Sequence, residues 1–346
     1  MTIIAARVSA LADTVALPDP GPLSAGEARF AVEHFALTAN NVTYAVHGED
    51  FAYWRFFPAP EGLGIVPVWG FARVTESLAD GISVGQRFFG YWPLGATAVL
   101  TPVQVSANPS NSGFTDGAAH RAGLPPFYNR YNPASAEWGD EALQCLFRPL
   151  YATSFLIDCL MASRPVDTLL LSSASSKTAL GVAQAARGRQ QVVGLTSPGN
   201  RDFCVNTGYY DQVLAYDDIA QVAGETIAFV DFSGHGGVRA DVHGLLGSRL
   251  KESHIVGDTH WQSPNAGDLP GPVPQLFFAP TVAQERVAEW GPAGFEQRLG
   301  AAWGRFAATL GWLRIERVTG EAAVARAWSD LVAGRIDPAA GIIASL

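Results

Sequence analysis

Apolar and polar residues alternate along much of the first 145 residues, in short runs that end at Gly, Pro or Asn. Examples are ARFAVEHFAL (residues 28–37), GIVPVWGFARVTES (64–77) and AVLTPVQVSA (98–107). Alternation with such breaks is typical of strands joined by turns, so this part is predicted to form a barrel-like β domain. The stretch 108–139 is irregular and holds four prolines. Its length favours a functional or mobile loop.

After this β-rich part, the pattern changes to strands that alternate with helices. Residues 149–163 have helical apolar spacing, and a buried strand (167–173), a helix (177–188) and a second strand (190–196) follow. The alternation continues to about residue 257. Strands that alternate with helices predict a parallel, doubly wound sheet of the Rossmann type.

The alternation stops near Pro280, and the last strands are predicted at 313–318 and 341–346. We therefore predict a discontinuous, β-rich catalytic and substrate domain from residues 1–145 and 281–346. Residues 146–280 are predicted to form a Rossmann-type dinucleotide-binding domain. A nucleotide domain inserted in this way predicts a cleft between the two domains, where ligands commonly bind.

Charge and cysteine content argue against several classes of protein. The formal net charge is −9 and the 23 basic residues are scattered. Nucleic acid is not expected as a partner, because its binding needs a basic face. Cys145, Cys159 and Cys204 form no CxxC pair, so neither a disulfide framework nor structural zinc is expected. The chain shows no secretory leader and no apolar run of membrane-spanning length, and we expect a soluble, cytoplasmic protein.

The stretch LLLSSASSKTALGVAQAARG (169–188) has the context of a dinucleotide-binding turn, with a strand before it and a helix after it. Such a turn usually has glycines where the chain bends and where it approaches the pyrophosphate. Aligned with GxGxxG, the stretch has Ala174, Ser176 and Ala179 at those positions. Small residues suit the same bend, and the sequence predicts a degenerate nucleotide turn.

Polar side chains in the same stretch suit a phosphate. Ser175, Ser176 and Thr178 would add hydroxyl hydrogen bonds at a helix N-terminus, and Lys177 would add a positive charge. The alternative is that Ser173 or Ser175 simply caps a helix, since both types of residue are common there.

The second strand of this region indicates which dinucleotide would bind. A site for NAD usually has an acidic residue about 20 residues after the turn, which holds the ribose hydroxyls. Here the strand ends with Thr196 and Ser197, Arg201 follows, and no acid precedes Asp202. Hydroxyls and an arginine suit the 2′-phosphate of NADP(H), to which Lys177 would add a second charge. The alternative is that Arg201 is an ordinary solvated helix residue.

Several segments together resemble the medium-chain dehydrogenase/reductase superfamily over essentially the whole chain. They are GLGIVPVWGFARVTES, VGQRFFGYWPLGATAVLTPVQV and LAYDD. The resemblance is closest to the zinc-free quinone and enoyl reductases. It implies an α/β fold in which a GroES-like β-barrel domain accompanies a Rossmann-type domain with a doubly wound parallel sheet. It also implies an NADP(H) cofactor, with Tyr216 of LAYDD in its site. Relatives are often homodimers paired through edge strands, so LKESHIVG (250–257) is a candidate interface segment.

More narrowly, LPPFYNRY, SSASSKTALG, DFSGHGGVR and THW resemble a bacterial family known only as a domain of unknown function. That resemblance implies no activity.

A catalytic metal is not expected. Where zinc-containing relatives have a Gly-His-Glu motif, this chain has VWGF (68–71), and it has no cluster of four cysteines. His34 and His47 alone cannot make a site. Without a metal, a carbonyl or conjugated double bond must be polarised by hydrogen-bond donors.

Donor candidates come from three parts of the chain, the third of which comprises two segments. The segment LTANNVTYAVHGED lies where zinc-free reductases line the nicotinamide and the substrate. The irregular stretch contains LPPFYNRY, and DFSGHGG and VGDTHW follow Rossmann strands. The candidates are Asn40, Asn41, Tyr44, Tyr128, Asn129, Tyr131, Ser233, His235, His260 and Trp261. Ser233 and His235 are assigned to the cofactor. Each aromatic or histidine also suits a purely structural role.

We predict Tyr128 as the donor, because a tyrosine hydroxyl stays protonated near neutral pH and a loop can bring it to the substrate. Asn41 and Tyr44 would position the substrate, and His260 is the alternative proton source. A serine hydrolase is not expected, since the chain has no GxSxG motif.

The predicted function is a zinc-independent, NADPH-dependent reductase acting on a small molecule, with hydride delivered to a carbonyl or conjugated enone or enoyl substrate. Two alternatives remain: an NADPH quinone reductase, and a non-catalytic NADP(H)-binding sensor or structural relative.

Overall fold

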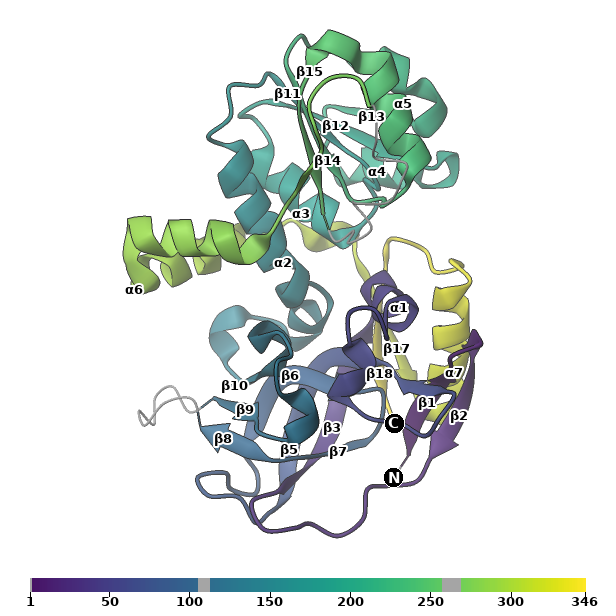
Figure 1. Ribbon diagram of the computed structural model, residues 1–346, viewed down its shortest axis with the longest axis vertical. Helices are drawn as coiled ribbons and strands as arrows, with labels where there is room; N and C mark the ends of the chain where they lie inside the picture. The colour runs from purple at the N-terminus through teal and green to yellow at the C-terminus, as the bar shows by residue number, and fades with distance from the viewer. Residues whose placement is uncertain (1, 105–112, 257–268) are drawn as a thin grey trace. The chain divides into compact units, whose positions relative to one another are not determined.

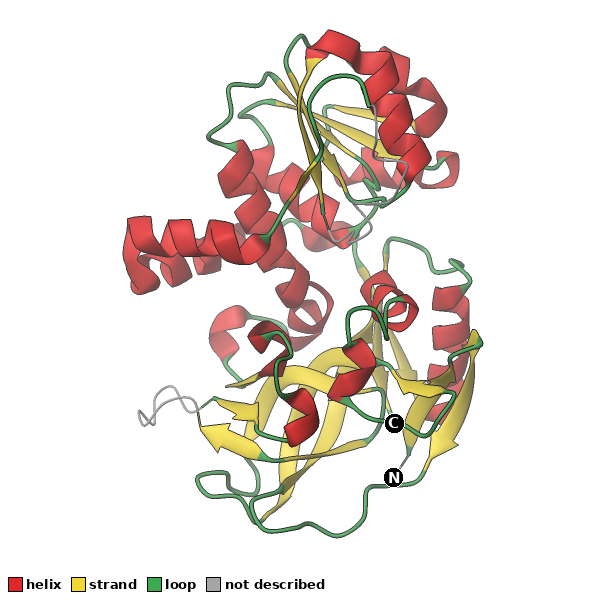
Figure 2. Cartoon of the chain, in the orientation of Figure 1, coloured by secondary structure: helices red, strands yellow, loops and turns green. Residues whose placement is uncertain are grey.

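Strands are the main regular elements of the first part of the chain and of its end, whereas helices and strands alternate between them (Figure 2). The computed structural model describes residues 2–104, 113–256 and 269–346. Its contacts group Met1–Leu146 with Leu313–Leu346 as unit 1, while Phe147–Trp312 forms unit 2.

Unit 1 is built around a mixed sheet whose long strand β3 buries Ala28, Phe30 and Val32 at alternate positions. The strands follow the order β17-β18-β3-β5-β6-β10-β9-β8, and β7 also pairs with β3. They are β3 (Ala28–Leu37), β5 (Pro67–Ser77), β6 (Arg87–Pro93), β7 (Thr97–Leu100), β8 (Pro102–Gln104), β9 (Phe114–Asp116), β10 (Arg130–Pro133), β17 (Arg314–Thr319) and β18 (Ala340–Ser345). The end of the chain therefore completes a sheet that its beginning starts (Figure 1).

A smaller sheet and two helices complete unit 1. The sheet has the order β2-β1-β4, from β1 (Ile3–Arg7), β2 (Ala10–Leu17) and β4 (Leu63–Ile65). The helices are α1 (Ala39–Val46) and α7 (Glu321–Val332). Trp328 of α7 is buried, and its indole nitrogen donates to the Leu11 carbonyl at 2.7 Å, which fixes α7 on β2. Helix α2 (Glu141–Met161) begins in unit 1 and continues into unit 2.

Unit 2 contains a parallel sheet in the order β13-β12-β11-β14-β15-β16. Its strands are β11 (Thr168–Leu171), β12 (Gln191–Thr196), β13 (Gln212–Ala215), β14 (Ile227–Asp231), β15 (Leu250–Ile255) and β16 (Gln275–Leu276). Its helices are α3 (Lys177–Ala186), α4 (Arg201–Thr207), α5 (Gly236–Leu246) and α6 (Ala279–Ala307). Numbered in chain order, the strands run 3-2-1-4-5-6, which is the Rossmann order. Helices α2 and α5 lie on opposite sides of the sheet (Figure 1), so the predicted doubly wound sheet is confirmed.

The central strands of unit 2, β11 and β14, are largely apolar because both faces of the sheet are covered there. Every residue of β11 and of β14 is buried. Leu170, Val193 and Phe229 meet in one core cluster on the same face. Burial on two faces explains the continuous apolar runs that the sequence shows at these strands.

The return to unit 1 occurs later than the sequence predicts. The expected boundary is residue 281, whereas the second part of unit 1 begins at Leu313. Helix α6 belongs to unit 2 because its aromatic residues pack on α2. Tyr151 of α2 stacks on Phe306 with ring centroids 4.9 Å apart, and it meets Trp303 edge to face at 5.5 Å.

The irregular stretch predicted at residues 108–139 is more ordered than expected in the part that the structure describes. It contains β9, β10 and the single-turn helix η4 (Pro126–Asn129). These strands are only three and four residues long, too short for alternation to reveal them.

Candidate functional site

The turn that joins β11 to α3 lies at the carboxyl edge of the parallel sheet, where doubly wound folds bind ligands. Ser173 adopts a left-handed conformation, with φ of +46°, a region that favours glycine. Ala174 does not adopt this conformation. In the described part of the chain, the non-glycine residues with positive φ are Ser173 and Ala52. The left-handed residue of the turn is thus Ser173, one place before the position that the predicted alignment gives to the first glycine.

Side chains from the segments next to β12 and β13 hold this turn. The Ser173 amide donates to the Tyr216 hydroxyl at 3.0 Å, and the Tyr210 hydroxyl donates to the Ala174 carbonyl at 2.7 Å. The Asn200 amide donates to the Ser175 hydroxyl at 3.1 Å. The turn is thus fixed from outside at three successive residues.

A glycine is needed next to the turn, on strand β12. A Cβ at Gly194 would lie 2.8 Å from the Cβ of Ala174 and 2.9 Å from the Tyr210 ring. Ala174 is fully buried in this contact, so it packs against the sheet and is not available to a ligand.

The first turn of helix α3, which follows this turn, carries groups that could bind an anion. Ser176 is the N-cap, and its hydroxyl accepts from the Ala179 amide at 3.2 Å. A serine therefore caps this helix, but it is Ser176 and not Ser173 or Ser175, the two residues considered from the sequence. The amides of Lys177 and Thr178 have no backbone partner within the described residues. Lys177 lies over the Phe147 ring at 5.7 Å, and burial lowers the pKa of its ammonium to about 8. These groups suit an anion.

The end of β12 carries the residues predicted to select the nucleotide. Thr196 is buried, and Ser197 is the N-cap of the single-turn helix η6 (Pro198–Asn200). Arg201 is exposed at the start of α4, where its Nε donates to the Val213 carbonyl at 3.3 Å. In the described part of the chain its two terminal nitrogens form no hydrogen bond or ion pair. They are therefore accessible to a phosphate.

The loop after β14 is organised by Asp231, which sequence reasoning missed. Asp231 is fully buried and accepts from the Ser172 hydroxyl at 2.7 Å and from the Ser233 hydroxyl at 2.6 Å. Arg239 of α5 forms an ion pair with it at 3.0 Å. The Ser233 hydroxyl is therefore already engaged, whereas His235, the N-cap of α5, has an exposed side chain.

In unit 1 the predicted donors form an aromatic cluster, which we define as Tyr44, Tyr53, Trp69, Tyr91 and Tyr128. The Tyr128 ring lies near the other four, with centroid distances of 5.1 to 6.2 Å. Tyr128 comes from η4, and Tyr53 from the single-turn helix η1 (Tyr53–Phe56). The structure thus brings the candidates Tyr44 and Tyr128 together and adds three aromatic residues that sequence reasoning missed.

Hydroxyl groups of the aromatic cluster meet one another. The Tyr44 hydroxyl accepts from the Asn40 amide at 2.5 Å and from the Trp69 indole at 3.2 Å. The Tyr128 hydroxyl lies within hydrogen-bonding reach of Tyr44 and Tyr53. Burial raises the pKa of all three phenols well above the ordinary value, so they remain protonated hydrogen-bond donors at neutral pH.

Asn41 does not join this cluster. Its side-chain oxygen accepts from the Thr38 amide at 2.7 Å, and its nitrogen donates to the Pro67 carbonyl at 2.9 Å. This is a capping box at the start of α1. Asn41 therefore fixes the helix that carries Tyr44, and its neighbour Asn40 reaches the hydroxyls.

A buried ion pair anchors the segment that carries Tyr128. Arg121 and Asp116 lie 2.9 Å apart, with side chains 1% and 2% exposed. Arg121 also donates to Asn129 at 3.0 Å and to the Tyr131 hydroxyl at 2.9 Å. Asn129 and Tyr131, two of the donor candidates, thus have structural roles.

Other predicted features lie elsewhere or outside the described residues. His260 and Trp261 fall in the stretch 257–268, outside the described part of the chain. Within residues 2–104, 113–256 and 269–346, no group of three or more His, Cys, Asp or Glu side chains could hold a metal ion. The helices in those ranges include none with the length and apolarity needed to cross a membrane.

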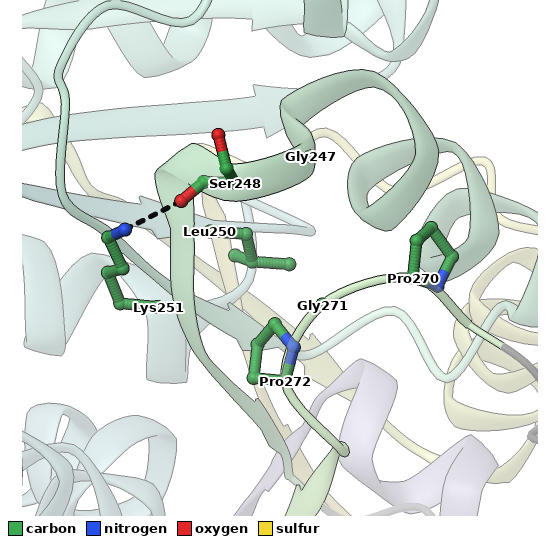
Figure 3. Close-up of a pocket in the computed structure, with 7 residues that line it drawn as sticks. All are labelled: Gly247, Ser248, Leu250, Lys251, Pro270, Gly271 and Pro272. Carbon is green, nitrogen blue, oxygen red and sulfur yellow. Dashed lines mark hydrogen bonds between the residues drawn. The ribbon is translucent and has the colours of Figure 1, made fainter.

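A surface hollow of about 630 Å³ lies at the amino end of β15 (Figure 3). Lys251 beside it donates to the Ser248 carbonyl at 2.7 Å. Because ligands of doubly wound sheets bind at the carboxyl ends of strands, this hollow is not the candidate nucleotide site.

Comparison with known proteins identifies the family of the chain and solved structures with a similar fold. A family model described as "Protein of unknown function (DUF2855)" matches residues 35–337. A search of curated proteins finds no match. Among solved structures, the JamJ enoyl reductase in its apo form is 10% identical with a TM-score of 0.63, over 100% of this chain and 99% of that one. The CurK enoyl reductase is 13% identical with a TM-score of 0.60, over 99% and 98%.

CurA from Vibrio vulnificus in complex with NADPH is 16% identical with a TM-score of 0.57, over 100% of this chain and 98% of that one. At sequence identities this low, structural similarity shows the fold and not the function. The predicted combination of a GroES-like β-barrel domain with a Rossmann-type domain, as in the medium-chain dehydrogenase/reductase superfamily, is confirmed.

Proposed function

We propose that this chain, which belongs to the DUF2855 family of proteins of unknown function, is an NADPH-dependent, zinc-independent reductase. Hydride would be delivered to a carbonyl or to a carbon–carbon double bond conjugated with one. One observation carries the proposal: a turn at the carboxyl edge of a sheet in Rossmann order leads into a helix whose first two amides have no backbone partner among the described residues.

The residues of unit 2 fit a dinucleotide. Lys177 and Thr178 would hold the pyrophosphate through their amides, and the Lys177 ammonium would add a charge. Ser197 and Arg201 would hold the 2′-phosphate, because no carboxylate lies between Thr196 and Arg201 to repel it. The nicotinamide, when bound, supplies the hydride.

The residues of unit 1 would stabilise the substrate oxygen. Tyr128 is proposed as the donor to the developing oxyanion or enolate, because its hydroxyl is held protonated among other hydroxyls. Asn40 and Trp69 fix the Tyr44 hydroxyl beside it. Asn41 would act through the position of α1, and His260 remains the alternative proton source.

The direct test is to mix the purified protein with NADPH, measure the enhancement of cofactor fluorescence, and then add enones, aldehydes or quinones. Oxidation with enones or aldehydes supports the proposal, whereas oxidation with quinones alone identifies a quinone reductase. Binding without oxidation of any acceptor would favour a non-catalytic NADP(H) sensor. Absence of binding would contradict all three.

NADPH is expected to bind at least about tenfold more tightly than NADH, a difference of roughly 1.4 kcal/mol. Arg201→Ala should remove most of this difference while leaving NADH affinity unchanged, because only the 2′-phosphate needs the arginine. Isothermal titration calorimetry measures both affinities. Arg187→Ala, at an exposed arginine at the end of α3, is the matched control and should preserve the preference. Tighter binding of NADH would contradict the assignment.

Purified protein is expected to contain much less than one zinc per chain and to keep its NADPH oxidation after chelation. Catalytic zinc needs about three protein ligands, which the described residues do not assemble. Elemental analysis before and after dialysis against a chelator provides the measurement. One zinc per chain, lost together with activity, would overturn zinc independence.

A further inference from the structure

Ser173 occupies a backbone conformation that serine rarely adopts. At its φ of +46°, the Cβ lies close to the backbone, which costs conformational free energy. Glycine avoids this cost because it has no Cβ. Such a conformation persists only where surrounding contacts over-determine it. The contact that does so here must act on the backbone of Ser173 itself.

Tyr216 supplies that contact. Its hydroxyl accepts the Ser173 amide at 3.0 Å, from the first residue of the single-turn helix η7 (Tyr216–Gln221). The Tyr216 ring packs against the core cluster that includes Leu195 and Phe229, so the position of the hydroxyl is fixed by apolar packing. Strand β13, which leads into η7, lies two strands away from β11. A side chain from a segment distant in sequence therefore holds the strained residue.

We propose that Tyr216 is a positioning residue that substitutes for the missing glycine of the nucleotide turn. In place of the direct cofactor contact that the resemblance implies for Tyr216, it holds Ser173 in the left-handed conformation and so places the amides of Lys177 and Thr178 for the pyrophosphate. This role rests on the proposed function, because it assumes that the turn binds a dinucleotide.

The neighbouring bonds make the turn depend on this contact. The Ser176 amide donates to the Ser173 carbonyl at 2.7 Å, and Ser176 caps α3. A change in the Ser173 backbone would therefore move the first turn of the helix. Ala174, the next residue, is clamped by Gly194 and by the Tyr210 hydroxyl and cannot absorb the change.

Tyr216→Phe is expected to weaken NADPH binding about fivefold, the equivalent of about 1 kcal/mol. It should also speed hydrogen exchange of the Ser173 amide, which loses its acceptor. Ser173→Gly in the Tyr216→Phe background should restore NADPH affinity to within about twofold of the parent, because glycine adopts the left-handed region without support. Ser173→Ala in the same background removes the same hydroxyl but keeps the Cβ, and it should not restore affinity.

Tyr209→Phe is the control for general loss of a buried tyrosine hydroxyl. The Tyr209 hydroxyl bonds to Thr309 and Trp312 and, within the described residues, to no residue of the turn. Its loss should therefore leave Ser173 exchange and NADPH affinity unchanged. Equal NADPH affinity in Tyr216→Phe and the parent would overturn the proposal. Weakened binding that Ser173→Gly does not restore would also overturn it, because Tyr216 would then contact the ligand directly.

If the protein does not bind a dinucleotide, the same variants give a different pattern of results. If the parent binds no NADPH, hydrogen exchange of the backbone amides still measures the conformation of the turn. Faster exchange at the turn in Tyr216→Phe, reversed by Ser173→Gly but not by Ser173→Ala, would then support the positioning role alone. Unchanged exchange of the Ser176 and Ala179 amides, which are hydrogen-bonded within the turn, would overturn it.

Discussion

Tyr128→Phe is expected to slow single-turnover NADPH oxidation by about 100- to 1,000-fold while leaving NADPH affinity intact. Removing one donor to a developing oxyanion typically costs about 2.7 to 4 kcal/mol in the barrier. The substitution keeps the ring, which packs at 5.1 Å from Tyr91 and 5.3 Å from Phe127, so only the hydroxyl is lost. Stopped-flow absorbance of NADPH after mixing with an enone measures the chemical step directly.

Companion variants show which hydroxyl reaches the substrate. Tyr44→Phe and Tyr53→Phe remove the neighbouring phenols, and His260→Ala removes the alternative proton source. Tyr209→Phe is the matched control, because that hydroxyl bonds to Thr309 and Trp312 of unit 2 and lies outside the aromatic cluster. A Tyr128→Phe variant as fast as the parent would remove Tyr128 from the mechanism. The slowest companion variant would then identify the donor.

The fold could be predicted from the sequence where burial imposes a simple pattern. Strands β11 and β14 are covered on both faces, so their apolar runs and intervening helices predict a doubly wound sheet. The end of unit 2 could not be predicted in the same way. Helical spacing in α6 shows that one face is buried, but it does not show that the face packs on Tyr151 of α2.

The turn could be located from sequence, but its geometry could not. A glycine marks a left-handed residue, and with serine at that position the signal disappears. Contacts such as that of Tyr216 with Ser173 join segments 43 residues apart, and periodicity carries no information about them. The same holds for Asp231 with Ser172.

Asn41 is a case where a local signal was available. Thr38 and Asn41 have the spacing of a capping box, in which the residue three places after the N-cap bonds back to it. That spacing predicts a structural role for Asn41 and leaves Asn40 as the amide that faces the hydroxyls. Tyr53, Trp69 and Tyr91 carried no comparable signal, because strand and loop aromatics usually pack in cores.

Arg121→Ala is expected to destabilise unit 1 by about 3 to 5 kcal/mol, the cost of breaking a buried ion pair from one side. The guanidinium lies 4.7 Å from the Phe57 ring centroid and 5.4 Å from that of Phe56, with Asp116 as its ionic partner. Alanine would leave the Asp116 carboxylate buried without its counterion. Hydrogen exchange of the β9 and β10 amides measures the effect on unit 1 separately from unit 2.

The matched control is Arg314→Ala, which breaks an exposed pair with Asp337 at 2.7 Å. Exposed pairs contribute about 0 to 1 kcal/mol, so exchange of the same amides should hardly change. Arg121 also holds Asn129, the residue after Tyr128, and its loss should therefore release the Tyr128 ring and reduce NADPH oxidation even below the unfolding temperature. Equal protection of β9 and β10 in Arg121→Ala and Arg314→Ala would show that the buried pair does not anchor this segment. The position of Tyr128 would then have to depend on its aromatic neighbours alone.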